Sequence, residues 1–233
     1  MKNFLWTVAM SIGLAFTMAP IAINDDAIVE AAETFTATIG PITASDPQVT
    51  LGAPVSANLL IADDDTATVA IAAGTNGSEP GPSNVTFTVT QSAVASVDTV
   101  IPVTYGGGAA SGVDYTAGPA TVTVLAGTTG PVTITLPVID DLVVEGTETL
   151  TATLGAPTSG LATLGAALAS RDIADDDTAT VSIALSAGGD GAAPGADNGE
   201  FTVTMSTTSA TPTTVRYTLG AGTATSGTDF TAL

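Results

Sequence analysis

The sequence predicts an all-β fold of tandem two-sheet β-sandwich modules, and three observations predict it. Apolar residues alternate with threonine and other polar residues at a period of two, which is typical of half-buried strands. Glycine- and proline-rich turns separate these segments, and no segment has the 3.6-residue spacing of an amphipathic helix. The stretch 61–69, Ile-Ala-Asp-Asp-Asp-Thr-Ala-Thr-Val, recurs unchanged at 173–181, and this repeat marks module boundaries 112 positions apart.

Residues 66–177 predict one complete module of seven strands. Each strand carries one apolar face, which allows two antiparallel sheets to pack together as a sandwich. In chain order the apolar stripes are Val69 and Ile71; Phe87 and Val89; Ile101, Val103 and Tyr105; Val122 and Val124; Val132, Ile134, Leu136 and Val138; Leu150, Ala152 and Leu154; and Ala169 to Ile173.

The sequence also predicts a partial module on each side of the complete one. Residues 25–40 match 140–155 at an offset of 115, which indicates the C-terminal half of a module. Residues 201–204 match 87–90 at an offset of 114, which indicates the N-terminal half of another. The predicted units are therefore 23–65, 66–177 and 178–233.

Residues 1–22 have two interpretations, and the sequence leaves both open. Lys2 followed by the apolar run 4–16 is similar to the basic and hydrophobic regions of a secretory signal peptide. Pro20 is unfavourable for cleavage beside Ala19 or Ala22, and the end of this segment would equally serve as a buried strand of the truncated first module.

The charge balance is strongly acidic. The chain of 233 residues has 23 acidic and three basic residues, with a formal net charge of −20, so it has no basic patch for phosphates and nucleic-acid binding is not expected. It contains neither cysteine nor histidine, which excludes a disulfide scaffold, a thiol nucleophile, a histidine-based triad and a typical zinc site. Its plentiful carboxylate oxygens suit Ca²⁺ or Mg²⁺.

The acidic residues of the complete module concentrate in turns that follow alternate strands. If successive strands reverse direction, the turns after the first, third, fifth and seventh strands lie at the same end of the sandwich. Carboxylates gathered there repel one another unless a proton or a cation lies among them, so we predict a metal site at this end. Its candidate ligands are Glu79, Asp114, Asp140, Asp141, Glu145, Asp175, Asp176 and Asp177, and the corresponding acids of the first unit are Asp25, Asp26, Glu30, Asp63, Asp64 and Asp65.

Four further acids are left out of this site. Glu33 and Glu148 are interpreted as first residues of strands that face water, and Asp98 and Asp172 as surface residues off the pattern. The sequence has no Asp-x-Asp-x-Asp-Gly loop, which excludes an EF-hand.

These motifs resemble the Calx-beta module of sodium–calcium exchangers and bacterial surface proteins. The resemblance rests on Asp-Asp-x-x-x-Glu-x-x-Glu-Thr at 140–149, Gly-x-Asp-aromatic at 112–115 and the closing Ala-Asp-Asp-Asp at 174–177, and it covers 66–177 and the matching halves on each side. It implies an immunoglobulin-like sandwich that binds Ca²⁺ at one end through the same eight carboxylates of the complete module. In the third unit Ala193 aligns with Glu79, and Asp197 is a substitute, so a weaker site is expected there.

The expected function is that of a calcium-binding structural or adhesive repeat module in a secreted or cell-surface bacterial protein. Ca²⁺ would stiffen the junction between modules. The expected partners are calcium ions, neighbouring modules, a cell-surface or matrix protein or polysaccharide, and a second copy joined head to tail through the two half-modules. One alternative is a regulatory calcium sensor of a larger membrane or signalling protein. Another is a carboxylate-pair hydrolase, but the nucleophile–base partners are missing, so no enzyme activity is expected.

Overall fold

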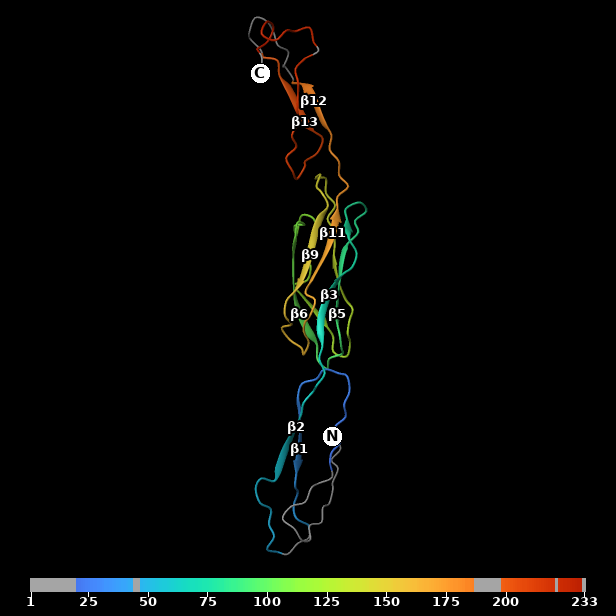
Figure 1. Cartoon of the computed structure of the whole chain (residues 1–233), viewed down its shortest axis with the longest axis vertical. Helices are drawn as coiled ribbons and strands as arrows, with labels where there is room; N and C mark the ends of the chain where they lie inside the picture. Colours follow the sequence, from blue (N-terminus) through green and yellow to red (C-terminus); the bar gives the residue numbers. More distant parts are fainter. Residues whose placement is uncertain (1–19, 44–46, 187–197, 221, 232–233) are drawn as a thin grey trace.

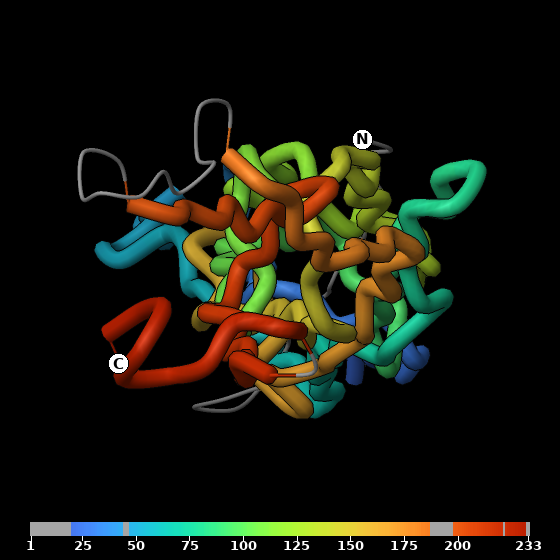
Figure 2. The backbone as a smooth tube through the Cα atoms, turned by 90° about the horizontal axis from the view of Figure 1, so that it is seen from above, coloured from blue at the N-terminus to red at the C-terminus, as the bar shows by residue number. Residues whose placement is uncertain are grey.

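The protein is an elongated chain of three β units. The computed structural model describes residues 20–43, 47–186, 198–220 and 222–231. The units follow one another along the long axis in chain order (Figure 1), and they overlie one another when viewed along that axis (Figure 2). Every regular element in the described residues is a strand, which confirms the all-β prediction. In the same residues, no helix has the length and apolarity to cross a membrane.

The central unit is a sandwich of two sheets. One sheet has the strand order β10-β3-β5-β8, and the other has the order β4-β11-β9-β6-β7. All seven strands predicted for residues 66–177 are present, together with two short strands that were not predicted, β4 and β10. The bounds are β3 Thr68–Ala73, β4 Gly77–Ser78, β5 Val85–Gln91, β6 Thr99–Gly107, β7 Thr121–Val124, β8 Val132–Leu136, β9 Glu148–Leu154, β10 Thr163–Leu164 and β11 Leu168–Ala174.

Strict alternation along the strands builds the core of the sandwich. Along β5, Val85, Phe87 and Val89 are buried, and the threonines between them lie on the outer face. Phe87 pairs with Ile134 on β8, and both side chains are almost fully buried. Leu150 on β9 is buried in the opposing sheet, so the apolar faces of both sheets contribute to one core. Burial of this apolar surface, at about 25 cal/mol per Å², is the main stabilising contribution.

The structure differs from the expected antiparallel sandwich in two short pairings. β4 pairs with β11, and β10 pairs with β3, in parallel. Each of these strands has two residues, too few to show a period in the sequence. Sequential strands also change sheet, as between β5 and β6. The main pairs are antiparallel nonetheless, so the seven predicted strands alternate in direction, and this alternation fixes where their turns lie.

The two flanking units are hairpins with exposed apolar residues. The first pairs β1 (Glu33–Thr38) with β2 (Ser56–Ile61), and the third pairs β12 (Val181–Leu185) with β13 (Phe201–Met205). These strands fall inside the predicted ranges 23–65 and 178–233, whose boundaries stay predictions. Most of segment 1–22, for which a signal peptide and a strand were both considered, lies outside the described residues, as do Ala193 and Asp197.

Candidate metal centre

The structure brings the acids of four separate turns together at one end of the central sandwich. Their carboxylate oxygens form three groups, and within each group the candidate ligand atoms lie within 4.8 Å of one another. The strand directions cause this, because β4, β6, β8 and β11 all run toward this end. The groups are Glu79, Asp141 and Asp177; Glu79, Asp140 and Asp176; and Asp114, Glu145 and Glu148. Asp175 contributes through its charge on Glu79 and through hydrogen bonds.

Backbone hydrogen bonds hold the loop that follows β8. The Val143 N–H donates to Asp141 Oδ1 (2.7 Å), which closes a tight turn around the aspartate. The Glu145 N–H donates to Asp175 Oδ2 (3.1 Å), so this loop is tied to the triple-aspartate segment after β11. Asp175 Oδ1 also accepts from the Asp177 N–H (3.1 Å). These carboxylates are therefore fixed by the backbone before any ligand binds.

Asp114 reaches the cluster from the loop after β6. Gly112 has φ +85°, a conformation that glycine adopts without steric cost, and its N–H donates to the Tyr115 carbonyl (2.8 Å). The Ala110 N–H donates to Asp114 Oδ2, and the Ile139 N–H donates to the Asp114 carbonyl oxygen (3.0 Å). Because Ile139 immediately precedes Asp140, the last bond joins this loop to the next acidic turn.

Glu79 is the most deeply buried acid of the cluster, with only 3% of its surface exposed. Its Oε2 atom and Asp177 Oδ2 are buried without a hydrogen-bond partner. Burial, together with the charges of Asp175, Asp141, Glu145 and Asp177, raises the pKa of Glu79 to about 7. Among the described residues, no arginine or lysine forms an ion pair with these carboxylates. Buried acidic oxygens without donors fit a hard divalent cation, which would supply the missing positive charge.

Glu148 belongs to this cluster, and the sequence interpretation that it faces water was wrong. It is half-buried, its Oε2 atom lacks a partner, and it lies with Asp114 and Glu145. Burial, followed by the hydrogen bond to Asp114 and the charges of Asp114 and Glu145, raises the pKa of Glu148 to about 7. The signal was available, because Glu148 is two positions before the buried Leu150 and therefore lies on the inward face of β9.

The other three excluded acids lie outside the groups of three acids, as expected. Glu33 is the exposed first residue of β1. Asp98 Oδ1 accepts from the Ala126 N–H (2.8 Å), and Asp172 Oδ1 accepts from the Thr149 hydroxyl (3.0 Å). Each has a local hydrogen-bonding role, and neither contributes a ligand atom to a group of three acids.

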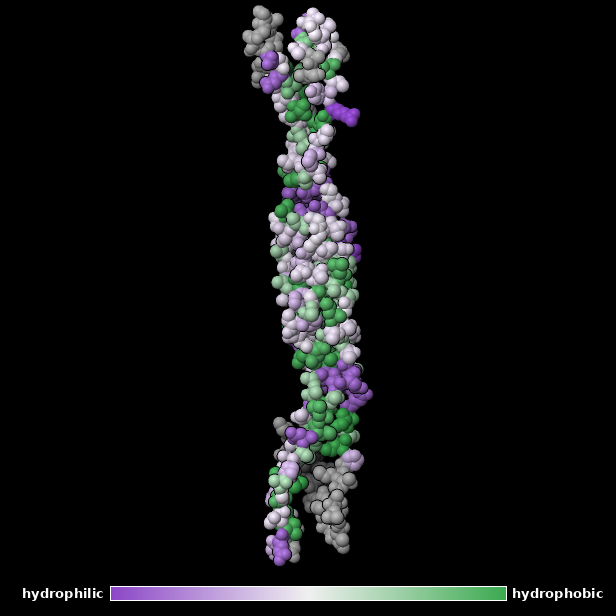
Figure 3. All heavy atoms as spheres, turned by 60° about the vertical axis from the view of Figure 1, so that its left-hand side comes forward, coloured by the Kyte–Doolittle hydropathy of each residue, from purple (hydrophilic) through white to green (hydrophobic). Residues whose placement is uncertain are grey.

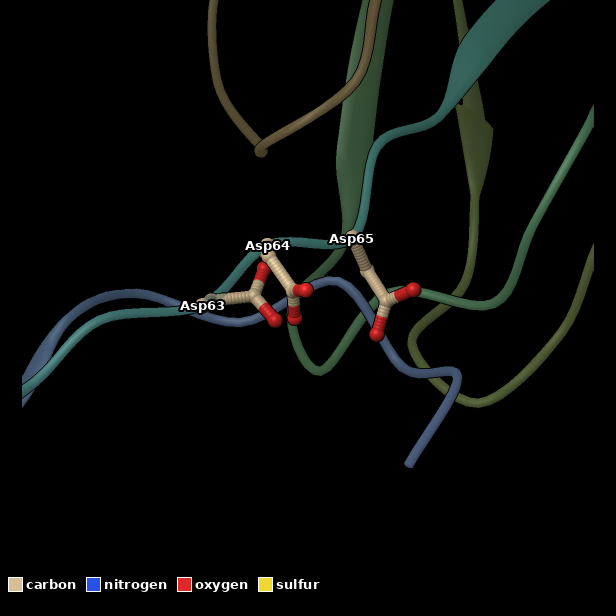
Figure 4. A group of neighbouring side chains, drawn as sticks. All are labelled: Asp63, Asp64 and Asp65. Atoms are coloured by element: carbon tan, nitrogen blue, oxygen red, sulfur yellow. The ribbon is translucent and has the colours of Figure 1, made fainter. Parts of the chain in front are cut away.

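The first unit repeats the arrangement at the other end of the central sandwich. Asp63, Asp64 and Asp65 gather their carboxylates beside the loop that contains Asp25, Asp26 and Glu30 (Figure 4), and these six acids line one depression. The two loop bonds recur, since the Ile28 N–H donates to Asp26 Oδ1 (2.8 Å) and the Glu30 N–H to Asp63 Oδ2 (2.9 Å). Figure 3 shows hydrophilic bands at both ends of the central sandwich.

This second cluster is less complete and more exposed than the first. Asp64 is exposed, and no equivalent of Glu79 or Asp114 is found in the described part of the first unit. Among the residues of the third unit that the structure describes, only the Asp229 loop corresponds to the site, with Gly227 at φ +83° and the Thr225 N–H donating to Asp229 Oδ2 (2.7 Å). The central cluster therefore has the fullest set of acids.

The raised pKa of Glu79 predicts a specific pH dependence of stability without metal. The unfolded chain loses the Glu79 proton near pH 4.5, but the folded chain keeps it to about pH 7. This contribution to the free energy of unfolding is therefore fully present below pH 4.5 and is lost as the pH rises to about 7. Urea denaturation in chelator measures the free energy of unfolding at each pH. Between pH 4.5 and about 7 this free energy should decline less steeply in Glu79→Gln than in the unaltered chain.

The matched control is Glu200→Gln, which removes an exposed acid outside the cluster. In this control the free energy of unfolding should decline with pH as steeply as it does in the unaltered chain. A free energy of unfolding with the same pH profile in Glu79→Gln and in the unaltered chain would contradict the assignment.

Comparison with known proteins identifies one matching family. The sequence model of the family described as "Calx-beta domain" matches residues 11–65, 79–184 and 196–233. Comparison with curated protein sequences gives no match.

Solved structures of Calx domains are also similar. The apo-form Calx CBD1 domain is 20% identical with a TM-score of 0.42, and the match covers 48% of this chain and 100% of that one. CBD12 from CALX1.2 is 20% identical with a TM-score of 0.39, covering 46% of this chain and 44% of that one. The calcium binding domain CBD12 of CALX1.1 is 21% identical with a TM-score of 0.39 and the same coverage. Because the family model matches most of the sequence, in one stretch for each unit, this chain belongs to the Calx-beta domain family.

Proposed function

We propose that this chain is a calcium-binding structural or adhesive repeat of a secreted or cell-surface bacterial protein, in which Ca²⁺ stiffens the junctions between modules. One observation carries the proposal: an acidic cluster with buried, unpartnered carboxylate oxygens lies at the junction of the central and third units. A less complete copy lies at the other junction. Membership of the Calx-beta family favours Ca²⁺, as does the similarity to a domain of CALX1.1 that is described as a calcium binding domain.

The donor set suits calcium better than a smaller cation. Ca²⁺ takes six to eight oxygen ligands at about 2.3–2.6 Å in flexible geometry, whereas Mg²⁺ requires a near-ideal octahedron and keeps several waters. The central cluster offers eight carboxylates in the three groups and Asp175 beside them. Glu79 is shared by two groups, so it would bridge neighbouring positions. Asp114, Glu145 and Glu148 would form the ligands of a further position.

These acids have a binding role in this function and no catalytic one. The triple aspartate recurs with the repeat, which is expected of a structural device and not of a single active site. A cation would replace the repulsion among the carboxylates by attraction to a common centre, and the loops that hold them would become more rigid. A secreted or surface location is part of the proposal, and millimolar extracellular calcium would suit an exposed junction of this kind.

Head-to-tail association with a second copy belongs to the same proposal. The hairpin of the first unit exposes Phe35 and Leu60, and the hairpin of the third unit exposes Ile183 and Phe201. Two such apolar faces could cover one another because the first unit matches the C-terminal half of a module and the third unit matches the N-terminal half. Sedimentation velocity should show association that increases with protein concentration. A single monomer species at every concentration, with and without Ca²⁺, would contradict this part of the proposal.

Calcium should stabilise the folded chain selectively. At a Ca²⁺ concentration about 100 times the Kd, binding to the native state alone adds about 2.7 kcal/mol, which corresponds to a rise in Tm of about 10 °C. Mg²⁺ at the same concentration should raise the Tm less. A thermal melt of the full chain in chelator, in Ca²⁺ and in Mg²⁺ measures this.

Two variants distinguish the cluster from other acids. Asp177→Asn removes the charge of a carboxylate whose Oδ2 atom is buried without a partner, so it should lose most of the calcium response. Asp98→Asn removes an acid outside the groups and should retain the response. An equal response in the two variants, or none in the unaltered chain, would reject the calcium site.

A further inference from the structure

The two junctions between units are built by one and the same contact. At the first junction the Val29 N–H donates to the Val94 carbonyl (2.8 Å), and the Ser96 N–H donates to the Val29 carbonyl (3.0 Å). At the second, the Val144 N–H donates to the Thr208 carbonyl (2.9 Å), and the Ala210 N–H donates to the Val144 carbonyl (3.0 Å). Both are isolated parallel bridges, which centre on Val29 with Ala95 and on Val144 with Ser209.

The repeat relates the two contacts position by position. Val144 follows Val29 by 115 residues, the same offset as in the acidic loops that contain them, and Ser209 follows Ala95 by 114. The contact at the second junction forms although the third unit is described only as a hairpin and loops. It therefore requires the loop after β13 and not a finished sandwich.

The candidate metal ligands hold the docking valine of each loop in position through hydrogen bonds to its two neighbours in the chain. The amides on either side of Val29 donate to Asp26 and to Asp63, and those on either side of Val144 donate to Asp141 and to Asp175. The valine N–H and carbonyl are thereby left to face the neighbouring unit. One short loop thus carries acids of the cluster and projects the residue that docks.

The segment of the central unit that receives Val29 is also held in place by hydrogen bonds within its own unit. The Gln91 side chain donates to the Ala93 carbonyl (2.8 Å), and the Gly127 N–H donates to the Ala95 carbonyl (2.9 Å). The Val94 carbonyl and the Ser96 N–H remain for Val29. Val29 is 4% exposed and belongs to the same core cluster as Ala95. The small residue at the centre of each bridge, Ala95 or Ser209, lets the valine approach closely.

We propose that the acidic loop of each module is a docking element and that segment 94–96, or 208–210 in the third unit, is its receptor on the module that follows. The partner that this receptor fits is the loop Asp-Asp-x-x-Val-Glu of another module of the same kind, recognised through two backbone hydrogen bonds and one valine. This valine is buried at the first junction and half-buried at the second. Modules of this type therefore stack in single file with a fixed register. This inference goes beyond the proposed function, because both hydrogen bonds of the contact join backbone atoms and no carboxylate takes part in them.

Hydrogen–deuterium exchange of the full chain tests the docking contact. In the unaltered chain in chelator, the Ser96 amide should be protected, and Val29→Asp should raise its exchange rate about tenfold or more because its acceptor is displaced. The matched control is Ile28→Asp, which adds the same charge to a neighbouring, partly exposed side chain and should leave Ser96 protected. Amides of β9 report whether the sandwich stays folded.

The second junction repeats the test away from the central core. Val144→Asp should expose the Ala210 amide, and Leu142→Asp, whose side chain is 74% exposed, should not. Rapid exchange of Ser96 and Ala210 in the unaltered chain, or equal effects of the valine variant and its control, would overturn the proposal. Protection of Ser96 that persists in chelator while Ca²⁺ fails to shift the Tm would count against the calcium proposal alone.

Discussion

Repulsion among carboxylates at the end of the central sandwich is the constraint on which the rest of this structure depends. Two full charges 4 Å apart near a protein surface repel by about 4 kcal/mol. A few such pairs approach the whole stability of a domain, about 5–15 kcal/mol. Protons held by Glu79 and Glu148 relieve the repulsion as the pH falls below about 7, because burial, together with the neighbouring carboxylates, raises the pKa of both groups. Above that pH a cation is the remaining means of relief.

The same constraint connects the site to the shape of the molecule. Asp141 and Asp175 accept hydrogen bonds from the amides on either side of Val144, and Val144 docks on the next unit. A change in the position of these carboxylates therefore moves Val143 and Glu145, which are bonded covalently to Val144, and so alters the contact between the modules. The sandwich supplies a rigid base for this arrangement, and its alternating strands bring the acidic turns to one end (Figure 1).

Most of the fold and of the acid cluster could be predicted from the sequence, because both follow from simple periodicities. Alternating apolar residues identified the seven strands, and the alternation of strand direction brought Glu79 and Asp177 together. The sequence interpretation missed Glu148 because an acid at the end of a strand usually faces water, whereas Glu148 shares a face of β9 with the buried Leu150. The two-residue strands and the bridge between Val29 and Ala95 could not be predicted from the sequence, because backbone hydrogen bonds leave no pattern in the side chains.

The most direct test of the central claim is the width of the distance distribution between the central and third units. The chain has no cysteine, so Thr133→Cys on β8 and Thr202→Cys on β13, both exposed, would carry the only two spin labels. If Ca²⁺ binds at the junction and stiffens it, pulsed electron paramagnetic resonance will give a narrower distribution in Ca²⁺ than in chelator. The narrowing will be lost in Asp177→Asn. A distribution of the same width in both conditions would contradict the account.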